Sequence, residues 1–352
     1  MRGSLVRRCG ILLAALALPV LLIGTASAAS SSGKLSSATL NGSGSSFQYG
    51  FIQVIQGGFK QAQKSVTVNY QPTGSGAGRT DFLNKVTDFG GTDAPYKATE
   101  PQPPAPFMYF PTVVAPITVS YNVSGVSKLN LSADTIAKIF QTQITTWNDA
   151  AIKEENPKAK LPSTTITVVH RSDSSGTTAN FTNFLTKAAP SVWTLGTGST
   201  VSWPASTQGG AQNTGVATLV KSTDGAIGYV DFSDATASDL TFASVKNSTG
   251  KYIAPSIESA SAAANGASIN ADLTYDPINS DGATAYPITS PTWIMVYTTQ
   301  SDANKGAAIK GFLNYIYGDG QQLASSVDYA PLPKGLLKQA KAQVKEIVVP
   351  AT

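Results

Sequence analysis

Cysteine and histidine are almost absent from this sequence of 352 residues. It contains one cysteine, Cys9, and one histidine, His170. A single cysteine cannot form an intramolecular disulfide, and zinc sites normally need several cysteine or histidine ligands. The composition therefore excludes a disulfide-stapled scaffold and a zinc finger, and we expect neither a metal ion nor another cofactor.

Charged residues are also scarce. Asp, Glu, Lys and Arg together make up 13% of the chain, about half of their usual share in a soluble protein. The only arginines are Arg2, Arg7, Arg8, Arg79 and Arg171. Proteins that bind nucleic acid normally carry clustered basic side chains. The charge content therefore argues against a nucleic-acid partner.

The sequence lacks an apolar run long enough to span a membrane comfortably. The nearest candidate, 11–23, follows three arginines and precedes the small-residue triplet Ala26-Ser27-Ala28. This order is typical of a secretory signal peptide. We therefore predict that residues 1–28 are a cleaved signal peptide and that the Ser/Gly/Ala-rich stretch 29–37 is a flexible lead-in. An uncleaved N-terminal anchor is the alternative.

Cleavage of residues 1–28 would remove the cysteine and most of the net positive charge. Cys9 lies before the apolar run, whereas a lipoprotein signal places its cysteine after that run, so we expect no lipid anchor. Removing the three leader arginines from 25 Lys and Arg leaves 22, against 21 Asp and Glu. We thus expect a nearly neutral mature protein that is periplasmic or secreted.

Strand-like and helix-like patterns alternate from about residue 38 onward. Runs of β-branched or alternating apolar residues predict strands, and apolar residues at helical spacing predict helices. Strands are expected at 66–70, 113–121, 164–169, 226–232 and 293–298, and helices at 51–62, 132–140 and 309–316, with Gly318 as the stop of the last helix. This alternation indicates an α/β fold with largely parallel sheets. About 320 residues exceed what one core usually serves, so we expect two lobes.

Three Gly/Ser-rich segments share one design. They are 41–47, 73–79 and 170–177, and each directly precedes a predicted helix. Backbone N–H groups and the positive end of the helix dipole attract anions at such a junction, and serine and threonine add hydroxyl donors. A single junction of this kind is more often an ordinary helix cap. Three in one chain predict a cage for a small oxyanion.

Familiar nucleotide-binding and hydrolase motifs are missing from the sequence. Gly42-Ser43-Gly44 begins like a dinucleotide-binding fingerprint, but Phe47 stands where its third glycine belongs. The chain has neither a Gly-x-x-x-x-Gly-Lys-Ser/Thr phosphate loop nor a Gly-x-Ser-x-Gly elbow. The Gly/Ser segments therefore point to neither a nucleotide cofactor nor a serine hydrolase.

Eight segments resemble those of PstS-type phosphate-binding proteins, the extracytoplasmic receptors of ABC phosphate importers. They follow the family's order from about residue 40 to the C-terminus, which makes the set far more specific than any single loop. The four signature segments are Gly-Ser-Gly-Ser-Ser-Phe at 42–47, Thr-Gly-Ser-Gly-Ala-Gly at 73–78, Asp-Phe-Gly-Gly-Thr-Asp-Ala-Pro at 88–95 and His-Arg-Ser-Asp-Ser-Ser-Gly-Thr at 170–177. Further matches lie at 144–148, 225–230, 286–289 and 328–333.

The resemblance implies a two-lobed periplasmic-binding-protein α/β fold of type II, with the ligand cleft between the lobes and two hinge crossovers. By analogy, 38–118 and 289–352 form lobe one, and 119–288 forms lobe two. It also implies that dehydrated phosphate is bound in the cleft. The implied phosphate-binding residues are Ser46, Phe47, Ser75, Asp93, Arg171, Ser175, Gly176 and Thr177, with Asp173, Gly74 and Gly76 in support.

Arg171 and Asp93 carry the chemistry of such a site. The guanidinium of Arg171 is a planar donor fork that stays charged and fits phosphate oxygens, and Asp173 would hold it in place. Asp93 would accept a hydrogen bond from the proton that phosphate carries. Sulfate has no such proton at neutral pH, so the site should reject sulfate. The alternatives are a surface ion pair for Arg171 and a turn-capping role for Asp93. For Arg79 and His170 we expect packed or surface positions.

The expected function is transport rather than catalysis. The expected partners are inorganic phosphate and the permease subunits of an ABC transporter, and we expect a monomer. A secreted phosphate scavenger or sensor and a binding protein for another tetrahedral oxyanion are the alternatives. A phosphatase is less favoured, because metal phosphatases need clustered carboxylate and imidazole ligands and this chain has one histidine.

Overall fold

Strands and helices alternate along residues 33–351, the part of the chain that this computed structural model describes. The strands are β1 (Ala38–Gly44), β2 (Val66–Gln71), β3 (Phe89–Thr92), β4 (Phe107–Asn122), β5 (Asn130–Leu131), β6 (Thr167–Arg171), β7 (Gln208–Gly210), β8 (Ala226–Asp231), β9 (Thr241–Phe242), β10 (Ser244–Lys246), β11 (Tyr252–Ile253) and β12 (Thr289–Tyr297).

The helices begin soon after β1. They are α1 (Tyr49–Ala62), α2 (Ser75–Leu83), α3 (Ala133–Phe140), α4 (Ala150–Glu155), α5 (Gly176–Ala188), α6 (Gln212–Ser222), α7 (Phe232–Ala237), α8 (Ile257–Asn265), α9 (Ala303–Tyr315), α10 (Gln321–Leu323) and α11 (Lys334–Gln343), with a π-helix at Ile316–Gly320 and 3-10 helices at Ala324–Val327 and Val344–Glu346. The predicted signal peptide with Cys9, and residues 29–32 of the predicted lead-in, lie outside the described residues.

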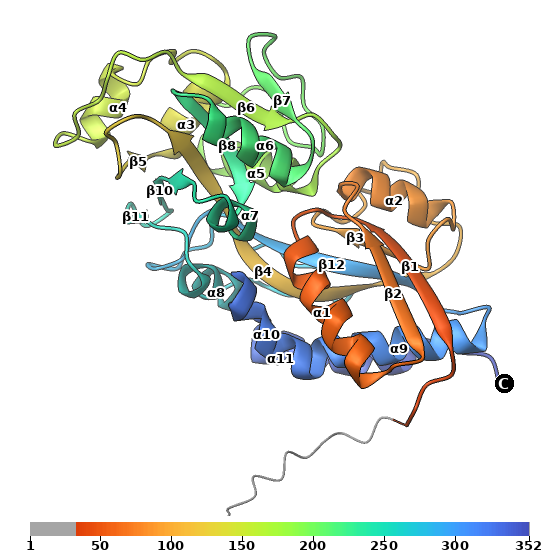
Figure 1. The fold of residues 1–352 in the computed structure, drawn as a ribbon. Helices are drawn as coiled ribbons and strands as arrows, with labels where there is room; N and C mark the ends of the chain where they lie inside the picture. Colours follow the sequence, from red (N-terminus) through yellow and green to blue (C-terminus); the bar gives the residue numbers. More distant parts are fainter. Residues whose placement is uncertain (1–32, 352) are drawn as a thin grey trace, which may run out of the picture. The chain divides into compact units, whose positions relative to one another are not determined.

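The long strand β4 joins the two halves of the main sheet (Figure 1). The strand order is β2-β1-β3-β12-β4-β8-β6-β7, with β9 also paired to β4. Up to Pro116, β4 pairs with β12, and from Ile117 onward it pairs with β8. A separate small sheet has the order β11-β10-β5. The hydrogen-bonded partner of β4 therefore changes from β12 to β8 between Pro116 and Ile117.

The main sheet is mixed, so the expectation of largely parallel pairing was wrong. β1 runs parallel to β2 and β3, and β6 runs parallel to β7 and β8. The central strands β4 and β12 run antiparallel to their neighbours. The neighbours of β4 in the sheet, β12 and β8, come much later in the chain, so the local sequence pattern does not set its direction.

The three Gly/Ser segments connect strands to helices, as predicted. They lead from β1 into α1, from β2 into α2 and from β6 into α5. In α1, Phe51, Ile55 and Phe59 repeat at four-residue spacing and form a buried face. The start of α2 packs directly on β1, because a Cβ on Gly78 would stand 2.2 Å from the Cα of Gly44. Three helix N-termini thus lie at the carboxyl ends of strands, where α/β folds bind ligands.

The last predicted helix ends differently from the expectation. α9 ends at Tyr315 and passes into the π-helix, in which Gly318 has φ −99° and ψ −110°. Gly318 is therefore a kink inside a longer turn rather than the left-handed cap of a helix. Within residues 33–351, none of the helices is both long enough and apolar enough to cross a membrane.

Candidate anion-binding site

The predicted loops meet at one place. The backbone N–H of Gly76 donates to the carbonyl oxygen of Ser174 over 3.0 Å, which links the start of α2 to the loop before α5. A Cβ on Gly176 would stand 2.4 Å from Ser75 Oγ and 2.6 Å from Asp93 Oδ2. A side chain at Gly176 would therefore hold these segments apart.

The two supporting glycines predicted from the sequence also lie at this junction. Gly74 has φ 93°, and a Cβ there would stand 2.4 Å from Asp173 Oδ2. A Cβ on Gly76 would stand 2.0 Å from Ser174 Oγ. Both positions thus need glycine for the close approach of the two loops, and Gly74 needs it for its backbone conformation as well.

The predicted site residues are buried and come from four segments. They are Ser46, Phe47, Ser75, Asp93, Arg171, Ser175, Gly176 and Thr177. Such burial removes donors and acceptors from water, so each needs a partner within the protein or on a ligand.

Arg171, at the end of β6, is held in one orientation. Its Nε donates to Asp173 Oδ1 over 2.8 Å, and its Nη2 donates to Asp173 Oδ2 over 2.5 Å. Its Nη1 donates to Thr177 Oγ1 over 3.3 Å, and its backbone N–H donates to the hydroxyl of Tyr229 over 3.0 Å. Burial alone would raise the pKa of Asp173, but the hydrogen bonds and charge of Arg171 lower it overall. Arg171 is therefore a buried cation held in a fixed orientation by the carboxylate of Asp173, and the two do not form a surface ion pair.

Three hydroxyl groups of the site have their oxygens occupied as acceptors. Ser175 Oγ caps α5 by accepting from the N–H of Thr178 over 3.1 Å. Thr177 Oγ1 accepts from Arg171, and Ser46 Oγ accepts from Asn213 Nδ2 over 3.3 Å. Among the described residues, none accepts a proton from these three hydroxyls. Their protons are therefore available to donate to an anion.

Asp93 follows β3 and is a buried acceptor. Its Oδ1 accepts from Ser45 Oγ over 2.5 Å, and its Oδ2 accepts from Ser75 Oγ over 3.1 Å. Burial raises the pKa of Asp93 to about 6, while hydrogen bonds from Ser45, Thr292 and Ser75 and the charge of Arg171 oppose the rise. The pKa of this carboxyl group therefore lies well above its ordinary value.

Ser75 has a different role from the other hydroxyls. It accepts from the backbone N–H of Asp93 over 3.2 Å and donates its proton to the carboxylate of the same residue. Its proton is therefore used within the protein in this arrangement. A contact from Ser75 to phosphate stays a prediction, and the backbone N–H at the start of α2 is its other available donor.

Comparison with known proteins identifies the family. A profile of the PBP superfamily domain matches residues 26–319. The phosphate-binding protein PstS of Xylella fastidiosa is 36% identical over 312 residues, which cover 87% of this chain and 85% of that protein. The PstS protein of Pasteurella multocida is 36% identical over 313 residues, with 87% and 90% covered. The chain belongs to the PstS family.

A solved structure shares the fold of this PstS-family chain. It is the high affinity periplasmic phosphate-binding protein PfluDING, bound with phosphate at pH 8.5. The TM-score is 0.71 at 22% sequence identity, and the match covers 90% of this chain and 100% of that chain. The fold is therefore the two-lobed α/β fold of type II periplasmic binding proteins, as predicted.

Sequence reasoning missed three polar residues of the site. Ser45 and Asn180 contact Asp93, and Asn213 contacts Ser46 and Thr177. Asn213 had a visible signal, because Gly209 and Gly210 precede α6 in the same strand-to-helix arrangement as the other loops. Ser45 lay inside a predicted segment, but its partner is far away in the sequence.

Arg79 and His170 lie beside the site without entering it. Arg79 Nη1 donates to Glu100 over 2.8 Å, and its guanidinium lies 5.2 Å from the ring centre of Tyr96. His170 stacks on Trp203 with ring centres 5.0 Å apart, and burial lowers its pKa. Both side chains therefore occupy packed positions, one of the two placements expected for them.

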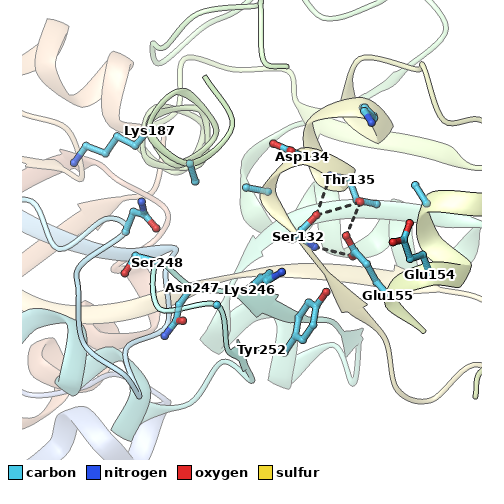
Figure 2. A pocket seen from close by; sticks show the side chains of 16 residues that line it. Ser132, Asp134, Thr135, Glu154, Glu155, Lys187, Lys246, Asn247, Ser248 and Tyr252 are labelled. Carbon is cyan, nitrogen blue, oxygen red and sulfur yellow. Dashed lines mark hydrogen bonds between the residues drawn. The ribbon is translucent and has the colours of Figure 1, made fainter. Parts of the chain in front are cut away.

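A separate polar hollow of about 850 Å³ lies between α3, α4 and the β10–β11 turn (Figure 2). Glu155 accepts from the N–H of Ser132 and the hydroxyl of Thr135, each over 2.8 Å. The rest of its lining carries both Asp134 and Glu154 and several lysines, so it has no preference for an anion. None of the predicted site residues lines it.

Within residues 33–351, no group of three His, Cys, Asp or Glu side chains is placed to hold a metal ion.

Proposed function

We propose that this protein binds inorganic phosphate outside the cytoplasm with high specificity and delivers it to the permease subunits of an ABC phosphate importer, without catalysing a reaction. Its PstS relatives are named phosphate-binding proteins, and PfluDING is described as periplasmic and bound with phosphate. Residues 1–28 serve as the export signal in this proposal, and the protein works as a monomer.

One observation carries the proposal: the buried carboxylate of Asp93 stands among hydrogen-bond donors. Asp93 Oδ2 lies close to Gly176, the first residue of α5, whose neighbours Ser175 and Thr177 offer free hydroxyl protons. Arg171 adds the positive charge. A fully deprotonated anion would leave Asp93 facing a negative oxygen. An anion that still carries a proton satisfies both the donors and the acceptor.

The proposed phosphate contacts follow from this arrangement. Side chains of Ser46, Asp93, Arg171, Ser175 and Thr177 and the backbone N–H groups of Phe47, Ser75 and Gly176 surround the ion. Asp173 orients Arg171, and Gly74 and Gly76 allow the loops to approach. Both HPO4(2−) and H2PO4(−) carry a proton that can form a hydrogen bond to Asp93, so either protonation state satisfies this arrangement.

We further propose that the lobes are 38–118 with 289–352 and 119–288, and that they close on the ion. The change of sheet partner at Pro116 and Ile117 of β4, and the start of β12 at Thr289, support these boundaries. The closed form would then be the one that the permease recognises, as in hinge closure of other receptors.

Calorimetry with phosphate, arsenate and sulfate on the purified protein tests the proposal. We expect phosphate to bind, arsenate to compete because it also carries a proton, and sulfate not to bind. Asp93→Asn should weaken the discrimination against sulfate, and Arg171→Ala should abolish tight phosphate binding. Tight sulfate binding by the wild type would refute the role of Asp93, and unchanged affinity of Arg171→Ala would refute the site.

A further inference from the structure

Asn213 bridges two of the hydroxyl groups of the site. It is the second residue of α6 and is fully buried. Its Nδ2 donates to Ser46 Oγ and to Thr177 Oγ1, each over 3.3 Å. Ser46 precedes α1 and Thr177 lies in the first turn of α5. One amide therefore joins segments that belong to different proposed lobes.

We propose that Asn213 is a positioning residue that sets the proton direction of both hydroxyls, so that each donates to phosphate in the closed protein. This inference rests on the proposed function and adds a residue that acts through Ser46 and Thr177. A hydroxyl has one proton and two lone pairs. When an N–H group occupies a lone pair, the hydroxyl proton turns away from that group and toward another acceptor.

Thr177 shows the effect most clearly. Its oxygen accepts from Asn213 Nδ2 and from Arg171 Nη1, each over 3.3 Å, so both lone pairs are occupied. Its proton must therefore be donated, and no group within residues 33–351 receives it. Ser46 accepts from Asn213 and likewise donates to none of the described groups. A buried oxyanion supplies the acceptor that both protons lack.

The start of α6 is anchored by the same carboxylate that orients Arg171. The backbone N–H of Gln212 donates to Asp173 Oδ1 over 3.0 Å. Gln212 has φ 60°, a left-handed conformation that residues other than glycine adopt at some cost. Asp173 thus supports both the guanidinium and the amide that act on Thr177.

The side-chain carbonyl oxygen of Asn213 allows a substitution to separate a positioning role from a structural one. This Oδ1 atom is buried and has no hydrogen-bond partner. An apolar side chain of similar size would remove the unpartnered oxygen, so the fold should tolerate it. With the amide turned round, Oδ1 would take the protons of Ser46 and Thr177, and phosphate would lose two donors.

A double-mutant cycle tests the role by calorimetry with inorganic phosphate. We expect Asn213→Leu to bind phosphate about ten- to hundredfold more weakly while its urea unfolding midpoint does not fall. Ser46→Ala should also weaken binding, and the double variant should lose less than the product of the two factors, because Asn213 acts through Ser46. Thr218→Leu, on the exposed side of α6, is the matched control and should bind like the wild type.

Asn213→Asp tests the same role with an isosteric side chain. Its carboxylate would accept the protons of both hydroxyls and repel the anion, so phosphate binding should fall below that of Asn213→Leu. Wild-type affinity in either variant, losses that multiply in the double variant, or failure of both variants to fold would each overturn the positioning role. If the wild type itself does not bind phosphate, the proposed function fails instead.

Discussion

Asn180 Nδ2 donates to the backbone carbonyl oxygen of Asp93 over 2.7 Å, in a buried position. The same amide donates to the carbonyl oxygen of Gly176 over 3.0 Å. Asn180 lies on α5, and Asp93 directly follows β3. One amide therefore connects the first turn of α5 to the segment that carries the buried acceptor, across the proposed lobe boundary.

This contact predicts a kinetic effect. Asn180→Leu removes a bond that forms only when the two segments meet, so phosphate should dissociate faster. We expect about a tenfold loss of affinity, equivalent to about 1.4 kcal/mol for one buried hydrogen bond. Stopped-flow displacement of phosphate measures it. Asn183→Leu is the matched control, because the amide of Asn183 bonds to Asp276 within the same proposed lobe. Equal dissociation rates in the two variants would contradict the prediction.

Gly176→Ala should weaken phosphate binding. The added Cβ would lie 2.4 Å from Ser75 Oγ and 2.6 Å from Asp93 Oδ2. Overpacking of about 2–3 kcal/mol would weaken phosphate binding about 30- to 150-fold. Gly335→Ala, near the start of α11, has open space around it and should leave binding unchanged. Calorimetry on both variants is the measurement, and tight binding by Gly176→Ala would show that the segments need not approach so closely.

The raised pKa of Asp93 predicts how stability depends on pH without phosphate. The pKa is about 6 in the folded protein, against the ordinary value of 3.8. The folded state therefore binds the proton more tightly than the unfolded state, and stability falls as pH rises from about 4 to about 6. The loss is on the order of 3 kcal/mol.

Asp93→Asn should abolish this slope, because the amide does not titrate. Urea unfolding in phosphate-free buffers across the same pH window measures the difference between wild type and variant. We expect the variant to gain stability relative to the wild type as pH rises, and to lose that advantage near pH 4. A parallel pair of curves would mean that Asp93 does not titrate in this range.

Arg79 should matter for stability rather than for binding. Its side chain is largely buried and pairs with Glu100. We expect Arg79→Met to lose about 1–2 kcal/mol of unfolding free energy and less than about tenfold in phosphate affinity. Lys221→Met breaks an ion pair with Asp239 that is far more exposed, and it serves as the control. A larger effect on affinity than on stability would place Arg79 in the binding site.

Local sequence patterns predicted the helix starts of this protein but not the features that depend on long-range pairing. The helices that begin after 41–47 and within 73–79 and 170–177 follow from glycine, serine and apolar spacing, which act over a few residues. The antiparallel direction of β4 and β12 did not follow, because strand direction depends on which segments meet in the sheet. Ser45 and Asn180 were missed for the same reason, since both contact Asp93 across long stretches of chain.

The sequence by itself determined the chemistry available to the site: an arginine two residues before an aspartate, three donor-rich helix starts, and the acidic Asp93 in the third signature segment. These are local properties of the chain. Only the tertiary structure decided which hydroxyl protons remain free. Ser75 gives its proton to Asp93, while Asn213 and Arg171 occupy the oxygen of Thr177 and leave its proton to a ligand. A hydroxyl can donate or accept, and its partners, brought together by folding, fix the direction.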